Sequence, residues 1–240
     1  LTSLPTLPNT LEDLDCSVNV ITGLPDLPQS LIELDCTSNQ INSLPALPST
    51  LDALYCGINP LFQLPTLPPA LRRLGCVATS LTALPTLPPM IWTIDCSGNQ
   101  LSVFPAIPAS LQYLSCSQNN LSVLPTLPTG MESLDCRSNP SLVLPSLPPA
   151  LNVFWCDAIN INTLPPLPNT IISLSCGDLN LTALPTLPDS LQYFNCANNQ
   201  LTTLPTLPNS LDRFHCDNNA LGSLPALPSS LTWFTCSNNT

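Results

Sequence analysis

The chain has 240 residues, with 15 Asp and Glu against four Arg and no Lys, which gives a formal net charge of −11. A surface that binds nucleic acid needs clustered Lys and Arg to neutralise phosphates. The composition therefore argues against nucleic acid and anionic membrane surfaces as partners. No run approaches the roughly 18 consecutive apolar residues of a membrane span, so we expect no membrane insertion.

A 20-residue phrase, L-P-x-L-P-x-x-L-x-x-L-x-C-x-x-N, recurs 12 times between Leu1 and Thr240. Self-similarity at such a period predicts a solenoid of stacked coils, in which each coil contacts only its neighbours. We number the positions of each repeat 1 to 20, starting at Leu1. One repeat domain is expected over residues 1–240, and because no cap is visible we expect it to be part of a longer protein.

Each repeat begins with a proline-rich arc, L-P-x-L-P, at positions 4–8. Two prolines fix φ and push the preceding residues into extended conformations, so no helix is expected there. Their three-residue spacing is that of polyproline II, which predicts that both Leu side chains face inward. Positions 13–17 then alternate exposed and buried, as in a short half-buried strand. The strands expected at 13–17, 33–37 and every 20 residues to 233–237 would stack as one parallel sheet.

Position 19, which follows the strand, is Asn in nine repeats. Its side chain is expected to bind backbone groups of its own and neighbouring coils. The series is interrupted at Thr79, Ile159 and Leu179, and at Ser141-Leu142 the expected Leu arrives one residue late. We expect local irregularity at these four places.

Position 16 is Cys in all 12 repeats, from Cys16 to Cys236. This position should point inward, where a thiol behaves as a small buried hydrophobe. Side chains on neighbouring parallel strands suit a disulfide poorly, and no short Cys-x-x-Cys spacing indicates a metal site. Buried reduced thiols are the favoured interpretation, with some disulfides or a metal or redox role as alternatives.

The repeat phrase resembles the leucine-rich repeat, and specifically its short bacterial 20-residue class with L-P-x-L-P. That class occurs in secreted effectors, and its Cys-bearing versions resemble those of bacterial surface proteins. The resemblance implies an all-β solenoid in a horseshoe or right-handed superhelix. Parallel strands would line the concave face, extended segments the convex side, and proteins would bind through the concave side.

The exposed strand positions 13, 15 and 17 vary most and form the candidate binding surface. Stacked carboxylates near the N-terminal end are candidates for a calcium ion or a basic partner, with a solvated acidic face as the alternative: Asp13, Asp15, Glu33 and Asp35. Aromatic side chains and Arg, the usual anchors of binding hot spots, are candidates for protein binding, with cross-strand stacking as the alternative: Tyr55, Tyr113, Trp155, Tyr193, Arg213, His215 and Trp233.

His215 has no Ser, Cys or Asp partner recurring at a useful spacing, so no catalytic site is predicted. The leading hypothesis is a non-enzymatic bacterial protein, extracellular or at the cell surface, which binds other proteins through the concave face. One alternative is a structural protein that assembles with itself, end to end or laterally, into a filament or surface layer. Another is the repeat domain of a secreted effector.

Overall fold

The structure is a computed structural model that describes residues 1–240, with short strands and no helix. The chain divides into two compact units, unit 1 (Leu1–Leu121) and unit 2 (Ser122–Thr240), which we describe separately. The strands of unit 1 are β1 (Asp13–Asp15), β2 (Glu33–Asp35), β3 (Ala53–Tyr55), β4 (Arg73–Gly75), β5 (Thr93–Asp95) and β6 (Tyr113–Ser115). Those of unit 2 are β7 (Ser133–Asp135), β8 (Val153–Trp155), β9 (Ser173–Ser175), β10 (Tyr193–Asn195), β11 (Arg213–His215) and β12 (Trp233–Thr235). None of the chain forms a helix with the length and apolar character that a bilayer crossing requires.

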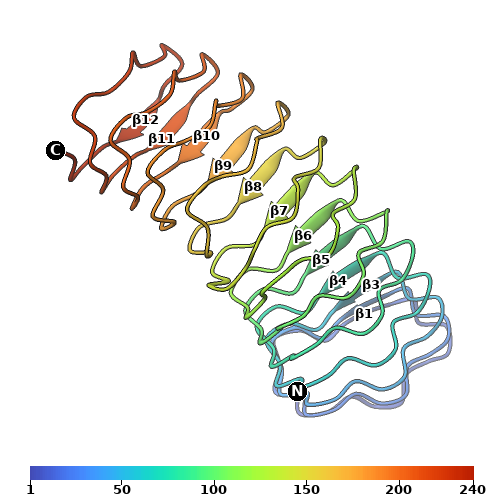
Figure 1. The fold of residues 1–240 in the computed structure, drawn as a ribbon. Coiled ribbons are helices and arrows are strands. Elements are labelled where there is room, and N and C mark those ends of the chain that lie inside the picture. Colours follow the sequence, from blue (N-terminus) through green and yellow to red (C-terminus); the bar gives the residue numbers. More distant parts are fainter. The chain divides into compact units, whose positions relative to one another are not determined.

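Within each unit the strands lie side by side in sequence order (Figure 1) and are parallel. Equivalent repeat positions face one another, as Leu14 faces Leu34 in unit 1 and Phe194 faces Phe214 in unit 2. This confirms the predicted solenoid of 20-residue coils with a parallel sheet. The proline-rich arcs contain neither helix nor strand, as their prolines predict.

Each strand covers three residues, positions 13–15, rather than the predicted five. The reason lies at position 18, which has a left-handed backbone in every repeat, with φ between 51° and 67°. Gly98, Asn198, Asn218 and Asn238 suit this conformation, whereas a β-branched residue such as Val18 adopts it at a cost. The left-handed residue turns the chain out of the sheet and so ends the strand early.

The core of both units consists of the side chains at positions 1, 11, 14 and 16. In unit 2, Phe154, Phe194 and Phe214 occupy position 14 with no exposed surface, and the rings of Phe194 and Phe214 stack with centroids 5.4 Å apart. The Leu side chains at positions 4 and 7 are buried or half-buried in most repeats. The inward orientation of the arcs is therefore confirmed.

The cysteine column is inside, as predicted, and its members are thiols. Eleven are buried, whereas Cys236, in the last repeat of the sequence, is exposed. Several thiols also donate to the carbonyl oxygen at position 15 of the next coil; Cys156 Sγ, for example, lies 3.4 Å from Ser175 O. Burial raises the pKa of Cys156, and it raises the pKa of Cys76 to about 12, because an apolar environment disfavours the thiolate.

Two ladders of side chains join successive coils. The predicted asparagine ladder is present: Asn59 Nδ2 donates to the carbonyl oxygens of Cys36 and Cys56, and its Oδ1 accepts from the amide of Ile41. The second ladder, at position 10, was not predicted. Ser30 Oγ lies 2.8 Å from Asn9 O and 2.6 Å from Leu11 O of the preceding coil, and Thr50, Ser110, Thr170, Ser190 and Ser210 repeat this arrangement.

The predicted irregularities are confirmed. The chain makes an additional turn around Ser141, which brings Leu142 into the buried position with no exposed surface. Turns also replace the usual bend near Thr79 and near Ile159. After Leu179, Asn180 adds a second left-handed residue with φ of 59°.

Candidate functional site

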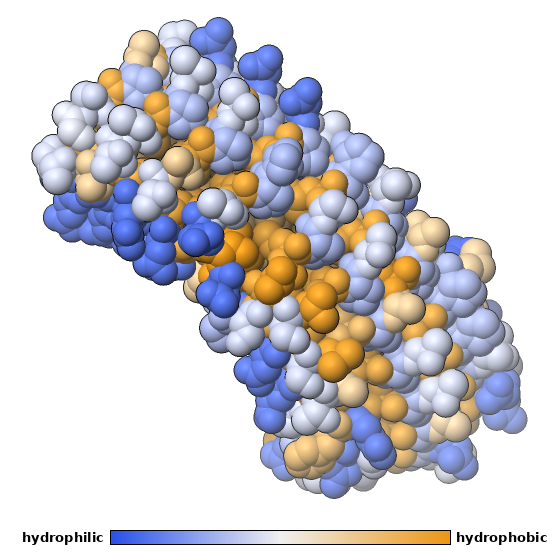
Figure 2. Space-filling view, viewed as in Figure 1, coloured by the Kyte–Doolittle hydropathy of each residue, from blue (hydrophilic) through white to orange (hydrophobic).

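The candidate binding residues all lie at positions 13 and 15, whose side chains stand on the sheet face opposite the core. Unit 1 carries Tyr55 on β3 and Tyr113 on β6, and unit 2 carries the other five on β8, β10, β11 and β12. Figure 2 shows that the visible surface of each unit mixes exposed hydrophobic with hydrophilic side chains. The two groups of candidates are treated separately because they belong to different units.

In unit 2, the predicted residues come together around two adjoining hollows. One, of about 360 Å³, lies between Trp155 and Tyr193, with Ser173 and Arg213 in its lining. The other, of about 410 Å³, lies between Tyr193 and Trp233 and is also lined by Arg213. The rings of Tyr193 and His215 are 5.8 Å apart. Arg213 and Trp233 are exposed, so both hollows open between aromatic walls with a cation at the shared edge.

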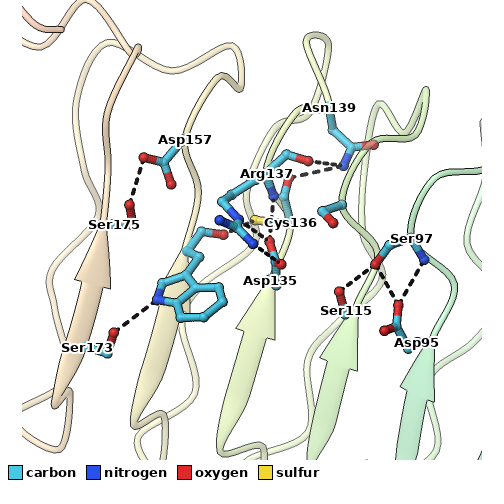
Figure 3. A network of polar contacts seen from close by, with 12 residues as sticks. Asp95, Ser97, Ser115, Asp135, Cys136, Arg137, Asn139, Asp157, Ser173 and Ser175 are labelled. Atoms are coloured by element: carbon cyan, nitrogen blue, oxygen red, sulfur yellow. Dashed lines mark hydrogen bonds and ion pairs between the residues drawn. The ribbon is translucent and has the colours of Figure 1, made fainter. Parts of the chain in front are cut away.

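Polar contacts on both sides fix the indole of Trp155. Its Nε1 donates to Ser173 Oγ across 3.0 Å, and the guanidinium of Arg137 lies 4.6 Å from the ring centroid. Arg137 lies along Asp135 (Figure 3), to which its Nε and Nη2 donate at 2.9 and 2.8 Å. This support was not predicted, because Arg137 is at position 17 of one repeat and Trp155 at position 15 of the next.

His215 has partners that the sequence analysis missed. Its Nδ1 lies 3.0 Å from Thr235 Oγ1, and the Thr235 hydroxyl donates to a carboxylate oxygen of Asp217. Asp217 is thus linked to His215 only through the Thr235 hydroxyl. The Thr235 proton is directed at Asp217, so His215 Nδ1 donates to the hydroxyl oxygen. This order leaves the ring no role as a base toward Thr235, and the contacts act to orient His215.

In unit 1, the four acidic candidates lie on β1 and β2, where Asp13 faces Glu33 and Asp15 faces Asp35. Glu33 reaches over the fully buried Ala53 to an ion pair with Arg73 at 3.1 Å. No group of three or more His, Cys, Asp or Glu side chains is arranged to hold a metal ion. The structure thus gives no support to the calcium interpretation of this patch.

Two of these four carboxylates, Asp15 and Asp35, share a structural role with other residues at position 15 that was not predicted. A side-chain oxygen at position 15 accepts the backbone amide at position 17, where the ladder has ended, at 2.9–3.2 Å in Asp15, Asp35, Asp95, Asp135 and Asn195. In Asp15 the side-chain and backbone hydrogen bonds from Ser17 hold the pKa below its ordinary value. Asp or Asn at position 15 therefore satisfies a backbone amide that has no partner in the neighbouring strand.

Unit 1 also has a hollow, and Tyr55 is the one candidate residue among those that line it. It has a volume of about 260 Å³ and lies over β3, β4 and β5, with Gly57, Gly75, Val77 and Asp95 among its lining residues. Tyr113 is elsewhere on the face, where it meets Trp92 edge to face with ring centroids 5.8 Å apart. Glycine at two outward positions was the signal in the sequence that could have revealed the hollow.

No protein-family model matches the sequence, and no curated protein matches it either. Solved structures do. YopM from Yersinia enterocolitica superposes with a TM-score of 0.95 at 37% identity over 99% of this chain. YopM from Yersinia pestis, described as a leucine-rich effector protein, matches all of the chain with a TM-score of 0.78 at 29% identity. The chain is a leucine-rich repeat protein.

The similarity covers only part of the longer relatives. This leucine-rich repeat chain spans 53% of the Y. enterocolitica protein and 81% of the Y. pestis protein. It also shares its fold with InlJ from Listeria monocytogenes, at a TM-score of 0.64 and 24% identity over 96% of this chain and 54% of that one; the InlJ domain is described as including a cysteine ladder. In this chain the thiols from Cys16 to Cys116 in unit 1 and from Cys136 to Cys216 in unit 2 are buried.

Proposed function

We propose that this leucine-rich repeat protein is a non-enzymatic scaffold that binds another protein through its strand face. The observation that carries the proposal is the pair of hollows in unit 2. They are bounded by Trp155, Tyr193, Arg213 and Trp233, which are the residue types that most often anchor protein interfaces. The remaining regular positions are occupied by the core and by the ladders that join coils.

The preorganisation of this face supports the same function. Trp155 is held from both sides by Ser173 and Arg137, and His215 is held by Thr235. A side chain already fixed in its bound orientation loses less conformational freedom on association. Trp233, 59% exposed, and the exposed Arg213 provide apolar and charged surface for a partner to cover.

The experiment compares a quadruple variant of the face with a matched variant elsewhere. The first carries Trp155→Ala, Tyr193→Ala, His215→Ala and Trp233→Ala. The second carries Thr126→Ala, Thr186→Ala and Thr206→Ala, all at exposed positions between the prolines of unit 2. Binders selected from a displayed protein library against the natural chain should lose at least tenfold in affinity for the first variant only. Equal binding to both variants would remove the aromatic face as the site.

Secretion or display at the cell surface is the setting we propose for this binding, in keeping with YopM from Yersinia pestis, which is a leucine-rich effector protein. Self-assembly stays a separate prediction. Light scattering of the purified chain over a range of concentrations tests it, and a constant monomer mass at high concentration would contradict it.

A further inference from the structure

The hollow of unit 1 exists because a glycine, which has no side chain, lies between a tyrosine and an aspartate on neighbouring strands. Position 15 carries Tyr55 on β3, Gly75 on β4 and Asp95 on β5, and these residues face one another in register. A Cβ atom added to Gly75 would lie 2.9 Å from Tyr55 Cδ1, so the tyrosine ring leans over the glycine. Gly57 and Val77 at position 17 extend the floor, which leaves a mostly apolar depression with Asp95 at its rim.

Arg73 holds the wall of this hollow in place. Its Nη1 donates to Tyr55 Oη at 3.4 Å, and its Nη2 donates to Glu33 and Asp52 at 3.1 Å each. With two carboxylates in contact, its charge is neutralised locally. The guanidinium therefore serves to tether the ring and does not make the hollow a site for anions.

The charge that remains at the rim is negative. Asp95 Oδ1 accepts from the amide and the hydroxyl of Ser97 at 3.1 and 2.6 Å, which fixes the carboxylate beside the hollow. Beyond Tyr55, Asp35 faces this residue in register and accepts the backbone amide of Thr37 at 2.9 Å. An apolar floor, an aromatic wall and a fixed carboxylate together complement a group that is apolar along its length and cationic at its end.

We propose that this hollow binds the Lys or Arg side chain of an extended basic segment of the partner protein. The aliphatic stem lies over Gly57 and Gly75 against the ring of Tyr55, and the cationic head meets Asp95. The volume of about 260 Å³ is below the roughly 300–1,000 Å³ of pockets for whole small molecules, which favours a single side chain. The proposal rests on the proposed function in that the partner is a protein, but it concerns unit 1 alone.

The test uses two peptides of the same shape. Acetyl-Gly-Lys-Gly-amide and its norleucine counterpart, which lacks the charge, are titrated into the ¹⁵N-labelled chain. Saturable shifts are expected at the amides of Gly57, Gly75 and Val77, with a Kd at least fivefold lower for the lysine peptide. Asp95→Asn should abolish the difference between the peptides, and Gly75→Ala should weaken both.

Matched controls separate the hollow from general effects. Asp15→Asn removes a carboxylate that caps an amide in the same way but lies outside the hollow, and Gly23→Ala adds a methyl group with no atom within 4 Å. Neither should change the binding of the lysine peptide. Should Gly75→Ala fail to fold, Asp95→Asn alone decides the question.

Three results would overturn the inference: no saturable shift at these amides, equal affinity for the two peptides, or a preference for lysine that survives Asp95→Asn. Because the peptides do not involve the aromatic face of unit 2, such a failure leaves the proposed function standing. Conversely, equal binding to both variants in the earlier experiment would remove the aromatic face of unit 2 as the site and leave the peptide result unchanged.

Discussion

The side-chain amide of Asn39 donates to the carbonyl oxygen of Cys16 across 2.9 Å and so joins two successive coils. The same side chain accepts the amide of Ile21 at 3.0 Å. In nine of the twelve coils one asparagine therefore satisfies backbone groups at the point where the strand has ended and the next arc begins. These bonds to its own and the preceding coil explain why Asn occupies position 19 in nine of the twelve repeats.

The first prediction concerns this ladder at Asn59, which is 4% exposed. Asn59→Ala removes the bonds to the amide of Ile41 and to the carbonyl oxygens of Cys36 and Cys56, of which Cys36 O keeps the bond from Asn39. The free energy of unfolding should fall by about 3 kcal/mol, because buried polar groups lose their hydrogen bonds. Urea denaturation measures the loss, and hydrogen exchange at Ile41 should accelerate. Asn42→Ala, at an exposed position, is the control, and an equal loss there would contradict the assignment.

The second prediction concerns the left-handed residue at position 18. Val18 has φ of 52° and is 79% exposed, so it carries backbone strain with little packing in return. Val18→Gly should raise the free energy of unfolding by about 1 kcal/mol, and Gly98→Ala, with φ of 67°, should lower it by a similar amount. Thermal unfolding measures both. If both substitutions shift stability in the same direction, backbone strain is not the cause.

The third prediction concerns alkaline pH. Burial raises the pKa of Cys76 from 9.0 to about 12, so the folded state keeps a proton that the unfolded state loses. The resulting contribution to stability is complete below pH 9 and is lost as pH rises from 9 toward 12. Each such thiol should make the free energy of unfolding fall more steeply with pH, by up to about 1.4 kcal/mol per pH unit.

Denaturation at pH 7, 9, 10 and 11 under reducing conditions checks this. Cys76→Ala should make the decline between pH 9 and 11 shallower, whatever it does to stability at pH 7. Cys236→Ala, at the exposed member of the column, should leave the slope as it is. If the free energy of unfolding of Cys76→Ala falls as steeply between pH 9 and 11 as that of the natural chain, the buried Cys76 thiol does not contribute to the decline.

The fourth prediction concerns the hydroxyl ladder that the sequence analysis missed. Ser210 Oγ lies 2.6 Å from Asp189 O and 2.7 Å from Leu191 O. Ser210→Ala should lower the free energy of unfolding by about 1 kcal/mol, the usual net contribution of such a hydrogen bond. The exposed Thr202→Ala in the same unit is the matched control and should change stability by less than half of that.

The positions of the candidate site residues could be predicted from the sequence, but the contacts that support them could not. The outward positions of Trp155, Tyr193, Arg213, His215 and Trp233 followed from a two-residue period, and the structure brings these residues together. Their supporting contacts did not follow, because a cation over a ring or a hydroxyl beneath an imidazole depends on rotamers of side chains about 20 residues apart. Likewise, Asp15 and Asp35 were read as a ligand patch, whereas their oxygens also accept the amides that the short strands release.

By itself the sequence determined the coil, its parallel sheet, the inward Leu and Cys columns and the asparagine ladder. These features repeat every 20 residues, and stacking in register converts a period in the chain into neighbours in space. Only the tertiary structure decided where each strand stops, which carboxylates are occupied by backbone amides, and where a missing side chain at Gly75 opens a hollow. Those outcomes depend on departures from the repeat, and their consequences are set by contacts between adjacent coils that no period encodes.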